Sequence, residues 1–151
     1  MSQLTMYLED FEKDQIFRSA ARTVTETDLT MFSMVTGDWN AIHSDAEFAA
    51  GTQFGQRLVH GLFGTSLMFG FMHQLGIFEG SALALLNIKD LSFQKPILIG
   101  DTLRLELTIL STRLTSDGKR GVVGRRFRLF NQKNEVLQDM TSDVLVLCRP
   151  A

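Results

Sequence analysis

The sequence predicts an α+β domain in which a long antiparallel sheet wraps around one apolar helix. Two observations support this fold class. Leu58 to Phe78 contains no Asp, Glu, Lys or Arg, so the helix that it predicts must be enclosed by the rest of the domain. After Ala82 the pattern changes to strands, and apolar residues alternate with polar ones at Leu103, Leu105, Leu107 and Ile109. This period of two indicates a strand with one buried and one wet face.

The length, net charge and composition are those of an ordinary globular chain. We expect residues 1–151 to form a single domain, because 151 residues suffice to bury a core. A net charge of -2 with 21% charged residues argues against a nucleic-acid partner. Cys148 is the only cysteine and no signal peptide is recognisable, so the sequence predicts a reducing, cytoplasmic setting. The polar residues within Leu58–Phe78 favour a buried helix over a membrane span.

The first third of the chain predicts a strand and then a helix. Residues 1–14 are weakly patterned and are interpreted as a lead-in or a short edge element. Ile16 to Val24 predicts a strand. Thr25 or Thr27 can cap a helix that follows, and Gly37 is its expected end.

Asp38 and His43 come directly after this helix. They are five residues apart and do not share a helical face, so they converge only if the segment between them is an irregular loop. Ser44-Asp45-Ala46-Glu47 has the form of a capping box and predicts a short helix that ends at Gly51. The apolar helix is expected over residues 61–75.

The C-terminal half predicts strands joined by hairpins. Asp117-Gly118 is a strong hairpin signal, and residues 131–134 mark a second hairpin. Val144 to Leu147 is expected to close the sheet, as the last of four strands.

A carboxylate and an imidazole that share a water form an acid/base pair, which typically contributes about 10²–10⁴-fold to a rate. Asp38 and His43 are the candidates, and Asn40 in the same segment can orient either group. The alternative is that Asp38 is a turn residue and His43 merely precedes a helix cap, since isolated pairs of this kind are mostly accidental.

His60 and Gly61 open the apolar helix. The exposed N–H groups at a helix start attract an oxyanion, and glycine lets another molecule approach closely. The alternative is tight packing of the helix start against the sheet. His60 and His73 are interpreted as structural residues, and three histidines so far apart do not predict a metal site. Ser66 can face a substrate, although a helical serine usually bonds its own backbone.

Basic residues are spread over the predicted strands and turns. A solvated sheet face explains most of them, while one or two are candidates for binding the phosphates of a substrate carrier. The set comprises Lys95, Arg113, Arg120, Arg125, Arg126 and Arg128.

Three separated segments carry a resemblance to a known family. They are Gly37-Asp38-Trp39-Asn40-Ala41-Ile42-His43 with Asp45 to Ala49, then Phe54 to Gly61, and Leu91-Ser92-Phe93-Gln94-Lys95-Pro96-Ile97 with Gly100-Asp101. In this order they resemble the MaoC-like hotdog family, specifically (R)-specific enoyl-CoA hydratases, over roughly residues 14–148. The chain has Ala41 where the family usually has proline, which implies a less rigid loop without loss of a catalytic group.

The resemblance implies a hotdog fold, with a five- or six-stranded antiparallel sheet around a central buried helix. It implies reversible hydration of 2-enoyl-CoA, in which Asp38 and His43 activate water, the Gly61 N–H holds the thioester oxyanion and Ser66 lies near the dyad. The expected substrate contacts are Asn40, Ser66, His60, Phe63, Phe93 and Lys95.

Neither a metal nor a redox cofactor is expected, because coenzyme A enters as part of the substrate. A hotdog thioesterase and a non-catalytic acyl-CoA-binding module remain the alternatives. The expected assembly is a homodimer or a higher oligomer, because a wrapped sheet leaves an open edge strand.

Overall fold

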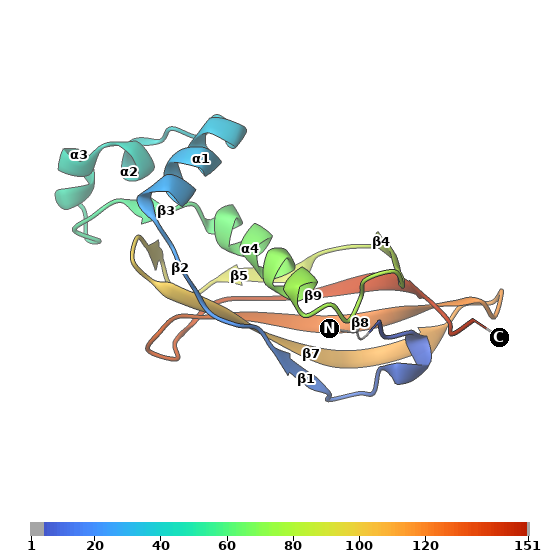
Figure 1. The fold of residues 1–151 in the computed structure, drawn as a ribbon. Coiled ribbons are helices and arrows are strands. Elements are labelled where there is room, and N and C mark those ends of the chain that lie inside the picture. The colour runs from blue at the N-terminus through green and yellow to red at the C-terminus, as the bar shows by residue number, and fades with distance from the viewer. Residues whose placement is uncertain (1–4, 151) are drawn as a thin grey trace.

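The computed structural model describes residues 5–150 and shows an antiparallel sheet with one helix along its inner face (Figure 1). The strand order is β1-β7-β8-β9-β4, with β2 also on β7 and β5 also on β9. The seven segments therefore fill five positions, because both outer positions are divided. Their bounds are β1 Ile16–Arg18, β2 Arg22–Thr23, β4 Ala82–Leu85, β5 Lys89–Phe93, β7 Thr102–Leu114, β8 Arg120–Phe130 and β9 Val136–Leu147.

The remaining elements lie mostly at one end of the sheet. Helices α1, α2 and α3 gather beyond that end, close to the start of α4 (Figure 1). A two-stranded sheet of β3 and β6 leads into α4. The bounds are η1 Leu8–Asp10, α1 Glu26–Thr36, α2 Ala41–Ser44, α3 Ala46–Ala50, β3 Leu58–Val59, α4 Gly61–Gln74 and β6 Ile97–Leu98.

The predicted strand over Ile16 to Val24 is divided into β1 and β2. Ser19 interrupts it, since the Ser19 Oγ accepts a hydrogen bond from the Leu105 N–H at 2.9 Å. A side-chain oxygen thus replaces the backbone carbonyl that would continue the ladder. The six segments that follow Ala82 exceed the four predicted, because β4, β5 and β6 are separate short strands and the last strand begins at Val136.

Several local signals are confirmed by the structure. Thr25 caps α1, where its Oγ1 accepts from the Asp28 N–H and the Asp28 carboxylate accepts from the Thr25 N–H. Gly37 ends the helix with φ at +74°, in the left-handed region that glycine adopts without strain. Gly118 and Asn134 adopt positive φ in the two predicted hairpins.

The expectation that α4 is enclosed nearly all round was wrong for the single chain. Gly64, Met68 and Phe71 on one face are buried in the core. On the opposite face the Leu62 side chain is 58% exposed, and Ser66 is also exposed. An apolar helix face therefore remains uncovered beside the sheet. Within residues 5–150 no helix combines the length and hydropathy required to cross a membrane.

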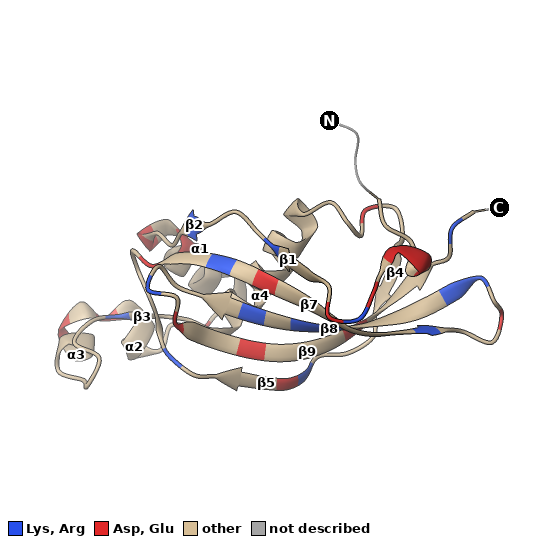
Figure 2. Ribbon diagram, turned by 90° about the horizontal axis from the view of Figure 1, so that it is seen from below, with Lys and Arg blue, Asp and Glu red and all other residues tan. Residues whose placement is uncertain are grey.

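The outer face of the sheet is not uniformly exposed to solvent. Figure 2 shows acidic and basic residues side by side on β7, β8 and β9. Glu106 is 6% exposed there, because it lies between Arg18 and Arg128 and forms ion pairs with both. Burial acts to raise the pKa of Glu106, but the hydrogen bonds from the two arginines outweigh it and hold this pKa below its ordinary value.

Gly64 sits where α4 approaches the sheet most closely. A Cβ there would lie 2.4 Å from the Ile97 side chain and 2.6 Å from the Gln138 Nε2. We therefore expect Gly64→Ala to lower the free energy of unfolding by about 1–3 kcal/mol, in spite of the better helix propensity of alanine. Urea unfolding followed by circular dichroism measures this.

Gly70→Ala in the same helix is the matched control. A Cβ at Gly70 meets no atom of the described residues within 4 Å, so this change should leave stability equal or raise it by up to about 1 kcal/mol. An equal loss in the two variants would contradict the packing argument.

Candidate active site

Short capping hydrogen bonds place His43. The Asn40 Oδ1 accepts from the Ile42 N–H at 3.3 Å, and the Asn40 carbonyl accepts from the His43 N–H at 2.8 Å. Asn40 thus caps α2, which carries His43. The irregular segment therefore covers only residues 38–40, and the prediction of a loop from Asp38 as far as His43 was wrong, because α2 begins at Ala41.

The predicted capping box at Ser44 was also wrong. The Asp45 Oδ1 accepts from the Phe48 N–H at 3.0 Å and caps α3 in its place. The Ser44 hydroxyl instead donates to the Trp39 and Asn40 carbonyls. Helix α3 ends before Gly51, as predicted.

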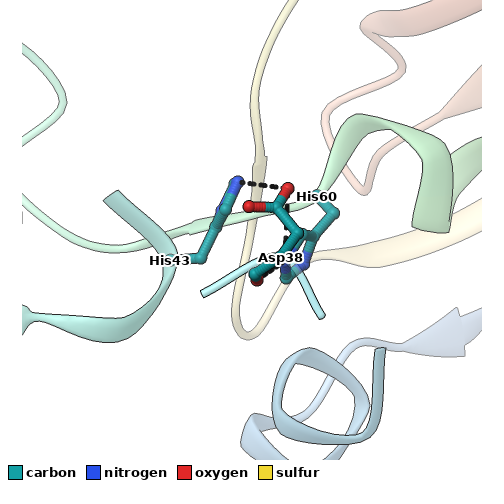
Figure 3. Close-up of side chains that lie close together, drawn as sticks. All are labelled: Asp38, His43 and His60. Atoms are coloured by element: carbon teal, nitrogen blue, oxygen red, sulfur yellow. Dashed lines mark hydrogen bonds and ion pairs between the residues drawn. The ribbon is translucent and has the colours of Figure 1, made fainter. Parts of the chain in front are cut away.

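The carboxylate of Asp38 faces the ring of His43 (Figure 3). The Asp38 Oδ2 lies 3.8 Å from the His43 Nε2. The His43 Nδ1 is 2.7 Å from the Leu58 carbonyl oxygen, and a carbonyl only accepts, so Nδ1 carries a proton and Nε2 is the atom left for chemistry. The two side chains thus approach each other from the end of α1 and from α2.

The 3.8 Å gap is too long for a direct hydrogen bond but suits a shared water. A water about 2.8 Å from each of the two atoms closes a triangle with them. The Asp38 side chain is 52% exposed and that of His43 is 14% exposed, so solvent reaches this position. The arrangement can therefore hold and polarise one water molecule.

His60 contacts both members of the Asp38–His43 pair. Its ring stacks on the His43 ring with centroids 3.8 Å apart and an interplanar angle of 24°. The His60 Nε2 lies 3.0 Å from the Asp38 carbonyl oxygen, so it donates its proton there. It also lies 3.2 Å from the Ser33 Oγ. His60 is 3% exposed and supports the dyad through these contacts. It also lines the hollow of Asp38 and His43, so the expected substrate contact of His60 stays a prediction.

Asp38, His43 and His60 also offer three ligand atoms within 4.8 Å of one another. His43 and His60 thus lie close together although they are distant in sequence, while His73 is not part of this group. The donor set nevertheless fits a metal poorly. The His60 Nε2 already donates its proton to the Asp38 carbonyl, so in this tautomer it offers no lone pair to a metal.

Gly61 begins α4 beside the dyad, and its N–H is one of the four that have no partner within the helix. A Cβ at Gly61 would lie 2.7 Å from the Phe93 ring, so any larger residue here would require this ring to move. Gly61 and His43 line two adjoining hollows. One, of about 370 Å³, also includes Phe93 and Lys95, and the other, of about 230 Å³, includes Asp38 and Leu62.

Comparison with known proteins gives the family. The MaoC-like domain model matches residues 10–127. The chain belongs to the MaoC-like family. Its sequence is 32% identical over 104 residues to an (R)-specific enoyl-CoA hydratase from Rhodospirillum rubrum, covering 68% of this chain and 69% of that protein. It is 31% identical over 104 residues to a 3-hydroxybutyryl-CoA dehydratase from Methylorubrum extorquens, covering 69% of this chain and 64% of that one.

Solved structures confirm the fold. A monoamine oxidase regulatory protein from Archaeoglobus has a TM-score of 0.89 at 30% identity, with 97% of each chain covered. An R-hydratase from Pseudomonas aeruginosa has a TM-score of 0.80 at 27% identity, with 96% of this chain and 88% of that one covered. A double-hotdog protein from Mycobacterium tuberculosis has a TM-score of 0.81 at 19% identity over 97% of this chain and 45% of that one.

The prediction of a hotdog fold in this family is therefore confirmed. The chain spans 30% of the length of protein MaoC from Klebsiella aerogenes, to which it is 32% identical over 68% of its own length. It is thus much shorter than that relative.

Two other predicted site residues of this MaoC-like chain, Ser66 and Phe63, line neither of the two hollows beside the dyad, whereas Lys95 lines the larger one. Ser66 is exposed and donates to the Leu62 carbonyl at 2.9 Å, so it bonds its own helix. Phe63 packs edge-on against Phe32. Lys95 lies 2.5 Å from Glu135, and this hydrogen bond, with one from Asn131, holds the pKa of Glu135 below its ordinary value.

The basic set does not form one patch. Most of its members form ion pairs on the outer face or in turns, with Arg126 on Asp139 and Arg120 on Asp117. Arg125 was not expected in the core, yet it is 1% exposed and faces the helix. Its burial follows from the register, because it shares the inner face of β8 with Val123 and Phe127.

Gln138 is a site residue that the sequence reasoning missed. It is 1% exposed, its Nε2 donates to the Gly61 carbonyl at 2.7 Å, and its Oε1 accepts from the Thr65 hydroxyl at 3.1 Å. Gln138 therefore anchors the first turn of α4 to β9. An inward position on a strand of alternating burial, occupied by a glutamine, is the signal that points to it.

We expect Gln138→Leu to lower the free energy of unfolding by about 1–3 kcal/mol, because the Thr65 hydroxyl and the Gly61 carbonyl lose a buried partner. Thermal and urea unfolding measure the change. Gln132→Leu is the matched control, since Gln132 is exposed in the turn that follows β8, where it bonds Thr102 and Asp101. If both glutamine variants lose the same stability, the anchoring role assigned to Gln138 is wrong.

Proposed function

We propose that this protein is an (R)-specific enoyl-CoA hydratase, which reversibly adds water to a trans-2-enoyl-CoA to give the (R)-3-hydroxyacyl-CoA. The observation that carries the proposal is the Asp38–His43 pair, which lies 3.8 Å apart beside the free N–H of Gly61. Membership of a family whose named relatives include hydratases and dehydratases of CoA thioesters supports it.

The chemistry follows from the positions of these groups. The water shared by Asp38 and His43 adds its oxygen to C3 while the pair accepts its proton, and the pair returns a proton to C2. Both steps occur on the face of the substrate that meets the dyad, so the addition is syn. Negative charge develops on the thioester oxygen between these events, and the Gly61 N–H at the positive end of α4 stabilises it.

The two hollows provide for the rest of the substrate. Both are lined by His43 and Gly61, which supports a thioester site at their junction. Lys95 lines the larger hollow, so it is the member of the predicted basic set that we assign to the CoA phosphates. A phosphate would then replace Glu135 as the ion-pair partner of Lys95. We propose that the reaction requires no metal and no redox cofactor, which agrees with the poor fit of the Asp38–His43–His60 donors to a metal.

The function is tested with crotonyl-CoA and a longer 2-enoyl-CoA, by following the absorbance of the enoyl thioester. Loss of this absorbance without release of free thiol is the expected result. Release of thiol at a comparable rate would instead indicate a thioesterase. Binding of acyl-CoA without either reaction would indicate a binding module.

We expect Asp38→Asn and His43→Ala each to lower kcat by at least about 10²-fold, the smaller contribution of a general acid or base. Both variants should keep the fold, because neither side chain lies in the core. His73→Ala is the matched control, since His73 is exposed near the far end of α4, and it should keep wild-type kcat. Near-wild-type turnover in both dyad variants would exclude the dyad.

We also expect the functional unit to be at least a dimer. Strand β4 lies at an edge of the sheet, and the exposed side chains there and just beyond are apolar, at Leu83, Leu85, Leu86 and Ile88. An open edge with apolar side chains pairs readily with a second copy. Light scattering at assay concentration should give at least twice the mass of one 17.0 kDa chain. A fully active species of single-chain mass would contradict this.

A further inference from the structure

Arg125 is a buried cation that the proposed reaction does not use. It lies on β8 with its side chain on the inner face of the sheet and is 1% exposed. Its guanidinium lies over the rings of Phe78 and Phe127, at 5.1 and 5.0 Å from their centroids. The next residue, Arg126, has the opposite orientation and pairs with Asp139 on the outer face.

The hydrogen bonds of Arg125 are incomplete. The Nη2 donates to the Ser142 Oγ at 3.1 Å, and the Nη1 contacts only the Met72 sulfur, a weak acceptor. Among the described residues the buried Nε has no partner, and no carboxylate of residues 5–150 forms an ion pair with the guanidinium. The Asp143 carboxylate attracts Arg125 from a distance but pairs with Lys89.

An unpaired buried charge is costly, so this site favours an anion. Burial lowers the pKa of Arg125 to about 10, which leaves the side chain charged at neutral pH. A carboxylate accepts two hydrogen bonds from one guanidinium, and such bonds are stronger than those between neutral groups. Arg125 therefore has the charge that a carboxylate requires, and its Nη1 and Nη2 each carry one N–H beyond those directed at Met72 and Ser142.

Arg125 lines a hollow of about 220 Å³ whose other lining is apolar. Phe69 and Met72 of α4 form one side, and Leu83, Leu85 and Val144 of the sheet form the other. This combination of an apolar wall and one cation suits a hydrocarbon chain that ends in a carboxylate. A methyl-terminated chain would fill the hollow without providing an acceptor for the guanidinium.

The hollow of Arg125 and that of the dyad lie along one face of α4. Leu62 lines the hollow of Asp38 and His43, Phe69 lines that of Arg125, and Ser66 lies between them on the same helical face. Met72 is eleven residues beyond Gly61, which corresponds to about 16 Å along the helix. An extended carbon chain rises about 1.2 Å per bond, so about 13 bonds cover this distance.

We propose that Arg125 binds a carboxylate at the far end of the acyl chain, so that the preferred substrates are CoA thioesters of long dicarboxylic acids. This inference rests on the proposed function, since it extends the acyl site from the dyad. The thioester lies at Gly61, the chain follows the exposed face of α4, and the terminal carboxylate accepts from the second N–H of the Arg125 Nη1 and from that of Nη2.

Binding measurements test the proposal without requiring turnover. The wild-type protein is titrated by calorimetry with the mono-CoA thioester of a saturated dicarboxylic acid of about 12–14 carbons. The methyl-terminated acyl-CoA of the same length is titrated alongside. We expect the dicarboxylic thioester to bind at least about 10-fold more tightly, the effect of a hydrogen bond to a charged group. Equal affinity of the wild-type protein for the two probes would overturn the proposal.

Three variants test whether Arg125 causes the preference for the dicarboxylic thioester. Arg125→Met removes the charge but keeps a long side chain against the aromatic rings, and it should bind the two probes equally. Arg125→Lys keeps the charge and should retain part of the preference. Arg126→Met is the matched control on the outer face and should retain all of it. An equal loss in the Arg125→Met and Arg126→Met variants would contradict the assignment.

Two further readings separate this inference from other outcomes. Crotonyl-CoA is too short to reach Arg125, so its turnover should be unchanged in Arg125→Met. If the wild-type protein does not hydrate crotonyl-CoA, this result counts against the proposed function alone. The mass of Arg125→Met is compared by light scattering. A change from oligomer to monomer, with no probe preference in the wild type, would show that Arg125 pairs with a second copy and would overturn the proposal.

Discussion

The docking of the first turns of α4 on the inner face of the sheet is the contact on which the rest of the site depends. Gly64 allows the helix to approach Ile97 and Gln138 closely, and Gln138 then binds the Gly61 carbonyl and the Thr65 hydroxyl. These bonds fix the direction of the helix axis. They also fix the position of the Gly61 N–H relative to the sheet, because Gln138 belongs to β9 and not to the helix.

The dyad is built around this fixed helix start by hydrogen bonds to the backbone. His43 is held by the Leu58 carbonyl of β3, and the Asp38 carbonyl is held by His60, the residue before Gly61. The stacking of His43 on His60 then sets the distance between the two imidazoles. Both groups of the proposed dyad are therefore positioned relative to the start of α4, where the thioester oxygen is proposed to lie.

Charge is distributed unequally between the two faces of the sheet. On the outer face, Glu106 and Asp139 pair with arginines of neighbouring strands, and solvent reaches most of these groups. On the inner face, Arg125 is surrounded by aromatic rings and a thioether. Two consecutive arginines of one strand thus have opposite environments, because successive side chains of a strand point to opposite faces.

The sequence by itself determined the features that depend on neighbouring residues. The cap at Thr25, the helix end at Gly37, both hairpins and the apolar helix follow from local hydrogen bonding and backbone conformation, and the alternation in β7 follows from its period. Asp38, His43 and Gly61 were named from their spacing and family pattern. The tertiary structure decided which distant residues meet. His60, Gln138 and Arg125 acquire their roles from contacts with residues 22, 77 and 53 positions away, and no local pattern encodes such contacts.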